Sequence, residues 1–166
     1  MRRVMGYQPV RTDGHAMRYI EAPNEVSELG GRSVFLAGGI SGCDDWQTRL
    51  VALLADTDLT LLNPRRRDFP MDDPTAAEGQ IAWEFRHLRA AWGRVFWFPP
   101  QTLCPITLFE LGGACQSDRP LLVGTHPDYQ RRQDVIIQLR LARPGVTVVH
   151  TLEALAEQVR RTAGTR

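Results

Sequence analysis

From Ser33 onward, short apolar runs alternate with stretches that have the spacing of amphipathic helices. We predict strands at residues 34–37, 59–62, 95–98, 120–123 and 146–149. The stretches between them predict helices from about residue 45 to 54 and at 76–92, 106–117, 132–142 and 152–161. In the first of these helices Trp46, Leu50 and Leu54 fall on one face, and Asp44 is placed to cap it.

This alternation predicts an α/β fold, a flavodoxin-like (Rossmann-like) doubly wound parallel sheet of five strands in the order 2-1-3-4-5. Residues 1–32 have no sustained helical or strand period, so we interpret them as an N-terminal arm and residues 33–166 as the folded domain. Open parallel sheets bind ligands beyond the carboxyl ends of their strands, where the strand order reverses. The segments expected to meet there are 38–45, 63–68, 99–110 and 124–134.

The length and composition fit one globular domain: 166 residues, 43% of them hydrophobic and 23% charged. The formal net charge of +1 does not favour nucleic acid as a partner. All 20 basic residues are arginine, which excludes chemistry that needs a Schiff-base lysine or a P-loop lysine. Any anion must therefore be recognised by arginine, backbone amides or helix N-termini.

The three cysteines, Cys43, Cys104 and Cys115, match neither a disulfide framework nor a metal-binding motif. The N-terminus lacks the apolar core of a signal peptide, and no apolar run is long enough to span a bilayer. We therefore expect a cytoplasmic protein without a membrane partner.

Two motifs carry candidate chemistry. Gly38, Gly39, Ile40 and Ser41 follow the first predicted strand and would let a backbone approach a phosphate or a sugar hydroxyl; the alternative is a tight turn between strand and helix. The segment from Thr107 to Glu110 has the spacing of a helix capping box, which is the structural alternative to a catalytic carboxylate. Against that alternative, Pro105 is well placed to open the helix before Thr107.

Other polar and aromatic residues allow two interpretations each. Arginines at 65–67 and 131–132 follow two predicted strands and suit a phosphate, but they also suit a solvated surface. His126 and His150 have no partners at metal-ligand spacing. The aromatic residues could stack on a base, yet their spacing favours core packing; they are Trp83, Trp92, Phe96 and Trp97.

Four segments of the chain, VFLAGGISG, WEFRHLRAAWGRVFWFPP, PITLFELGGA and HPDYQRRQDVIIQL, resemble the nucleoside 2-deoxyribosyltransferase-like family over about residues 19 to 159. The resemblance implies an enzyme that cleaves or transfers the N-glycosidic bond of a (deoxy)nucleoside or a nucleoside 5'-monophosphate. Glu110 matches the nucleophile of this superfamily, with Thr107 and Gly112 in register. The resemblance also implies no metal, no organic cofactor, and a homo-oligomer that is a dimer or larger.

The sequence departs from the family pattern at two usual aspartate positions, which hold Cys104 and Trp92. We therefore consider Glu84 and Asp134 as the acid or base, although each could be a solvated or capping carboxylate. The residues expected to bind substrate are Gly38, Gly39, Ile40, Ser41, Asn63, Arg65, Pro105 and Arg132. Two alternative functions stay open: a catalytically silent nucleotide-binding module and an oligomeric partner-binding protein.

Overall fold

The computed structural model describes residues 16–26, 28–29, 31–70, 72–73 and 75–164, so residues 1–15 of the predicted arm lie outside the described residues. The strands are β1 (Arg18–Glu21), β2 (Ser33–Gly38), β3 (Thr60–Asn63), β4 (Gly93–Phe98), β5 (Leu121–Thr125) and β6 (Val148–Val149). The helices are α1 (Trp46–Leu53), α2 (Ala76–Ala90), α3 (Pro105–Ala114), α4 (Arg132–Ala142) and α5 (Leu152–Ala163).

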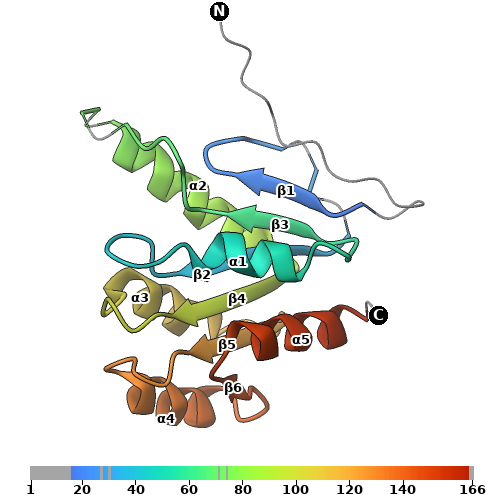
Figure 1. Ribbon diagram of the computed structural model, residues 1–166, viewed down its shortest axis with the longest axis vertical. Coiled ribbons are helices and arrows are strands. Elements are labelled where there is room, and N and C mark those ends of the chain that lie inside the picture. Colours follow the sequence, from blue (N-terminus) through green and yellow to red (C-terminus); the bar gives the residue numbers. More distant parts are fainter. Residues whose placement is uncertain (1–15, 27, 30, 71, 74, 165–166) are drawn as a thin grey trace, which may run out of the picture.

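All six strands form one parallel sheet in the order β1-β3-β2-β4-β5-β6 (Figure 1). The five predicted strands keep their order 2-1-3-4-5, but the predicted number is wrong because the arm contributes β1. This strand pairs with β3 in the register Arg18↔Thr60 to Glu21↔Asn63. β1 lies at the edge of the sheet, where Arg18 is exposed and only Ile20 is buried. It therefore lacks the continuous apolar run that marks the strands inside the sheet.

Helices cover both faces of the sheet. On the first face, which is nearer the viewer in Figure 1, α1 and α5 pack through Trp46, Leu50 and Leu155. On the second face α2, α3 and α4 pack through Trp83, Leu111 and other apolar residues. Full burial of each such side chain contributes about 1.5–3 kcal/mol. Because β2, β4 and β5 are parallel, their carboxyl ends lie at the same end of the sheet, and a helix follows each of them.

Several helix ends differ from the prediction by a few residues. Asp45, and not Asp44, caps α1, because its carboxylate accepts hydrogen bonds from the backbone N–H of Thr48 at 3.0 Å and its hydroxyl at 2.8 Å. Helix α2 ends at Ala90 because Ala91 takes an extended conformation, with ψ of 140°. Helix α3 begins at Pro105, before the predicted start, and ends at Ala114.

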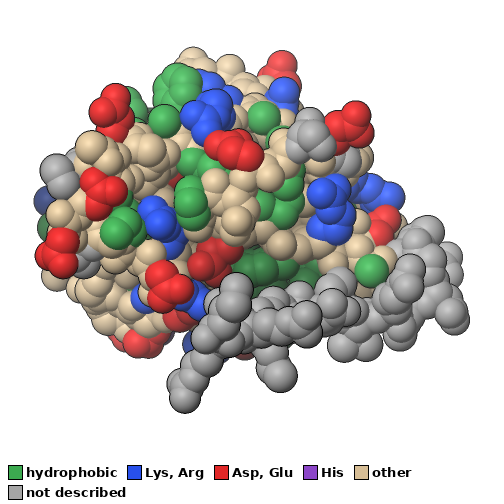
Figure 2. Space-filling model, turned by 90° about the horizontal axis from the view of Figure 1, so that it is seen from above, with side chains coloured by type: hydrophobic (Ala, Val, Ile, Leu, Met, Phe, Trp, Pro, Cys, Tyr) green, Lys and Arg blue, Asp and Glu red, His purple; other side chains and the backbone are tan. Residues whose placement is uncertain are grey.

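The surface mixes both signs of charge. Figure 2, which views the molecule from the end at the top of Figure 1, shows arginine side chains interspersed with Asp and Glu. Within the described part of the chain, no helix has the length and apolar character needed to cross a bilayer.

Candidate active site

Two carboxylates, one from α2 and one from α3, come together on the second face of the sheet. Glu84 and Glu110 are both half-buried and lie close enough for their charges to interact. Burial, and to a smaller extent the charge of Glu84, raises the pKa of Glu110 to about 7. Burial also raises the pKa of Glu84. A pair of this kind holds one proton near neutral pH, as a reaction that needs both an acid and a base requires.

Gln80 fixes the position of Glu84. It lies one helical turn earlier on α2, and its Nε2 donates hydrogen bonds to Glu84 Oε1 and to the backbone oxygen of Pro64, both at 2.7 Å. Because Pro64 follows β3 directly, this contact ties the carboxylate to the end of that strand. The Gln80 Oε1 atom is buried and has no hydrogen-bond partner among the described residues, so it remains able to accept one from a ligand.

The start of α3 shows that the Thr107 to Glu110 motif is not a capping box. Cys104 precedes the helix in a left-handed conformation, with φ of 51°, and Pro105 is its first residue. Thr107 therefore lies inside the helix, is buried, and is not its cap. Glu110 follows one turn later, toward Glu84. Burial raises the pKa of the Cys104 thiol to about 11, so this residue does not supply the charge of a carboxylate.

The glycine turn after β2 is packed against the protein itself. A Cβ atom at Gly38 would lie 2.4 Å from the Trp46 ring and 2.5 Å from the Trp97 backbone oxygen. At Gly39 it would lie 2.7 Å from Pro99 Cγ. These contacts explain the glycines as a requirement of packing. The next residues are more open, since Ile40 is half-buried and Ser41 is exposed.

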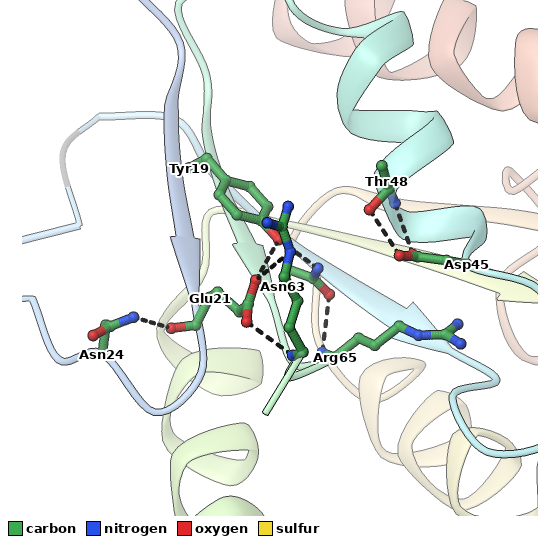
Figure 3. A network of polar contacts seen from close by, with 8 residues as sticks. Tyr19, Glu21, Asn24, Asp45, Thr48, Asn63 and Arg65 are labelled. Carbon is green, nitrogen blue, oxygen red and sulfur yellow. Dashed lines mark hydrogen bonds and ion pairs between the residues drawn. The ribbon is translucent and has the colours of Figure 1, made fainter. Parts of the chain in front are cut away.

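A polar network joins the arm to the end of β3 (Figure 3). The side chains of Tyr19, Glu21 and Asn63 point toward one another: Asn63 Nδ2 donates to the Tyr19 hydroxyl at 2.8 Å, which in turn donates to Glu21 Oε2 at 3.1 Å. Asn63 is buried, and its Oδ1 accepts from the Arg65 backbone N–H at 2.9 Å. Asn63 thus shapes the segment that follows β3, with its Nδ2 and its Oδ1 each bonded inside the protein.

Arg65 braces the glycine turn. Its guanidinium donates to the backbone oxygens of Cys43 at 3.0 Å and Asp44 at 2.9 Å, and to Gln47 Oε1 at 3.3 Å. These bonds use three of the five N–H groups of the side chain. Arg65 therefore positions the turn, while Arg132, half-buried at the start of α4, has no side-chain partner among the described residues and is the better candidate for a ligand anion.

The remaining predicted residues lie at the rim. Pro105 is exposed at the start of α3. Asp134 is exposed in the first turn of α4 and forms an ion pair with Arg131 at 3.7 Å, which is the solvated arrangement and not a buried acid or base. The aromatic residues Trp83, Phe96 and Trp97 are buried, as their spacing predicts.

A cavity of about 320 Å³ opens on the first face, between residues of α1 and the start of α5. Its lining includes Trp46, Trp97, Pro99, His126 and His150. Pro99 lines the cavity and also packs beside Gly39, so the cavity borders the glycine turn. Among the described residues, no three His, Cys, Asp or Glu side chains group as metal ligands.

Sequence reasoning missed Gln80, Tyr19 and Glu21. The spacing of Gln80 and Glu84, four residues apart on one helix, was a usable signal. Tyr19 and Glu21 gave none, because their role depends on a strand pairing between segments about 40 residues apart.

The family model described as nucleoside 2-deoxyribosyltransferase like matches residues 31–129, more than half of the chain. The protein therefore belongs to the nucleoside 2-deoxyribosyltransferase-like family, which confirms the resemblance. None of the curated proteins compared with the chain matches it. The matched region contains β2 to β5 with both carboxylates, and membership supports a nucleoside-related enzymatic function.

Proposed function

We propose that the protein cleaves or transfers the N-glycosidic bond of a nucleoside or a nucleoside 5'-monophosphate, with Glu110 as nucleophile and Glu84 as acid and base. The observation that carries the proposal is the half-buried pair of Glu84 and Glu110, with the pKa of Glu110 at about 7. The family supports the substrate class. The pair supports the mechanism, because glycosyl transfer through a covalent intermediate needs one ionised and one protonated carboxyl group.

The proposed reaction has two steps, both at C1' of the sugar. A Glu110 carboxylate oxygen bonds to C1' of the sugar while the bond from C1' to the base nitrogen breaks, and the Glu84 carboxyl gives its proton to the leaving base. Water or a second base then attacks C1', the ester bond to Glu110 breaks, and Glu84 takes up the proton that the acceptor loses. Two displacements at C1' give net retention. Water as acceptor makes the protein a hydrolase, and a base makes it a transferase.

The test is a panel of nucleosides and their 5'-monophosphates, with and without an acceptor base, analysed for released or exchanged base by chromatography. We expect Glu110→Gln to lower turnover at least about 100-fold. Glu78→Gln removes an exposed glutamate from the same α2 and should leave turnover unchanged. Full activity of Glu110→Gln would refute the mechanism. No turnover by folded wild type across the panel would favour the silent nucleotide-binding module.

The pH profile separates the two roles. The mechanism needs one proton on the pair, so kcat/KM should fall as the pH rises through about 7, where the pair loses that proton. In Glu84→Gln, Glu110 titrates without its partner, so the residual activity should rise with pH as this nucleophile ionises and should have no such basic limb. A wild-type rate that rises through pH 7, or a basic limb that stays in place in Glu84→Gln, would assign the roles differently.

We further propose that a second copy of this chain covers the carboxylate pair. Helix α3 has Glu110 as its only charged residue, and its outward side chains are apolar: Ile106 is 66% exposed and Phe109 82%. Ile81 and Phe85 are also exposed and flank Glu84 on α2. A helix that is apolar on all sides is normally buried. Light scattering should therefore show a dimer or larger, and Phe109→Glu should shift it toward a monomer; a wild-type monomer would refute this assembly.

A further inference from the structure

Four arginines gather at the amino ends of β4 and β5. Arg94 is the second residue of β4 and is 5% exposed, and Arg119 precedes β5. Arg89 lies in the last turn of α2, and Arg143 directly follows α4. We call this set the arginine cluster. It lies at the opposite end of β4 from the glycine turn, and about 9 Å of helix separates Glu84 from the end of α2.

Hydrogen bonds hold the cluster together. Arg94 Nε donates to the Leu88 backbone oxygen at 2.8 Å, and Arg119 Nη1 donates to the backbone oxygens of Ala90 at 2.8 Å and Ala91 at 2.6 Å. Arg143 donates to the Ser117 backbone oxygen, just after α3. Both Arg94 and Arg119 therefore converge on the end of α2, where positive charge is favourable for the helix dipole.

Helix capping does not account for the whole cluster. A guanidinium has five N–H donors, and capping uses one from Arg94 and two from Arg119. Arg94 Nη1 is buried and has no hydrogen-bond partner among the described residues. A buried donor to which nothing bonds is destabilising, and more so when it is charged.

Among the residues that the structure describes, none of the four arginines forms an ion pair with a carboxylate, whereas nine other cation–carboxylate pairs occur. Burial lowers the pKa of Arg94, and the three other guanidiniums lower it further. Arg89 instead stacks on the Phe85 ring, 3.5 Å from its centroid. The nearest acidic residue along the chain, Asp118, is exposed and unpaired in this part of the structure.

We infer that the arginine cluster binds the phosphate group of a small molecule, at a site distinct from the carboxylate pair. Arginine forks match phosphate oxygens in pairs, and several converging guanidiniums without a carboxylate are the arrangement that phosphate recognition uses. Arg119 is exposed and Arg143 half-buried, so an anion from solvent can reach both of these guanidiniums of the cluster. The bound anion supplies both the missing acceptor and the missing negative charge.

Isothermal titration calorimetry of the full chain tests the site with three probes: inorganic phosphate, pyrophosphate and a nucleoside 5'-monophosphate, each at matched ionic strength. We expect pyrophosphate to bind wild type and to bind Arg119→Gln and Arg143→Gln about tenfold more weakly, the effect of one lost charge-assisted hydrogen bond. Arg49→Gln is the matched control, because Arg49 is an exposed arginine paired with Glu153 on the other face. It should bind as wild type does.

Three results would overturn the site. They are absence of pyrophosphate binding to wild type at millimolar concentration, unchanged affinity in both cluster variants, and equal weakening in the Arg49→Gln control. Binding that Arg132→Gln weakens and Arg119→Gln does not would place the phosphate at the carboxyl ends of the strands, which also counts against the cluster. Because the readout is binding, the result is independent of whether Glu110 is a nucleophile. Agreement among the three probes identifies the phosphate group as the feature recognised.

Discussion

Replacing Glu110 with glutamine should make the protein more stable, and increasingly so as the pH rises. The pKa of Glu110 is raised by burial, and further by Glu84, from an ordinary value of 4.5 to about 7. The folded state then holds this proton up to about pH 7, whereas the unfolded chain releases it near pH 4.5. The contribution to stability is therefore fully present below pH 4.5 and is lost as the pH rises through 7. The full loss is about 3 kcal/mol.

Glutamine has nearly the same shape and does not ionise. The difference in unfolding free energy between Glu110→Gln and wild type should therefore be about 2 kcal/mol larger at pH 8 than at pH 5. Urea denaturation followed by the fluorescence of the four tryptophans measures it, with Glu78→Gln as the exposed control. A difference that stays constant between pH 5 and pH 8 would refute the idea that burial of this carboxyl group sets its pKa.

Three further changes test the packing around the site by the same denaturation assay. Gly39→Ala places a methyl group 2.7 Å from Pro99 Cγ and should destabilise the fold by about 1–3 kcal/mol; an unaffected midpoint would mean that the turn yields easily. Gly79→Ala, where a methyl group meets nothing within 4 Å inside α2, should stabilise it by about 1 kcal/mol, and destabilisation would contradict the open space at that position. Tyr19→Phe leaves the buried Asn63 amide without its acceptor and should cost about 1–3 kcal/mol, whereas a neutral effect would show that the arm does not hold β3.

The strands inside the sheet were predictable because burial on both faces gives them continuous apolar runs. β2 and β4 are buried along nearly their whole length, and apolar residues run without a break over 34–37 and 95–98. Edge strand β1 was not predictable in the same way. It lies within the arm and spans four residues, of which only Ile20 is buried. Its pairing with β3 depends on tertiary contacts that local patterns do not contain.

The same difference between local patterns and tertiary contacts decides which residues of the candidate site were predictable. A local motif and the family resemblance together made Glu110 a candidate, and the role of Pro105 in opening α3 removed the capping alternative for Thr107. Whether Glu84 or Asp134 would join Glu110 could not be decided from the sequence, because the answer depends on how two helices rotate about their axes when they pack. The structure directs Glu84 toward Glu110 and leaves Asp134 in solvent beside Arg131.

The arm stabilises the site from two directions, which gives a physical reason for the additional strand β1. Through Glu21 and Tyr19 it holds Asn63 and the segment after β3, from which Arg65 braces the glycine turn. Immediately after β1, the Asn24 backbone oxygen accepts a hydrogen bond from Trp83 Nε1 at 3.0 Å, one residue before Glu84 on α2. When both carboxyl groups of a buried pair are ionised, above neutral pH, their two negative charges repel each other. Fixing α2 to β1 on one side and to Pro64 on the other opposes that separation, so the edge strand helps to keep Glu84 within reach of Glu110.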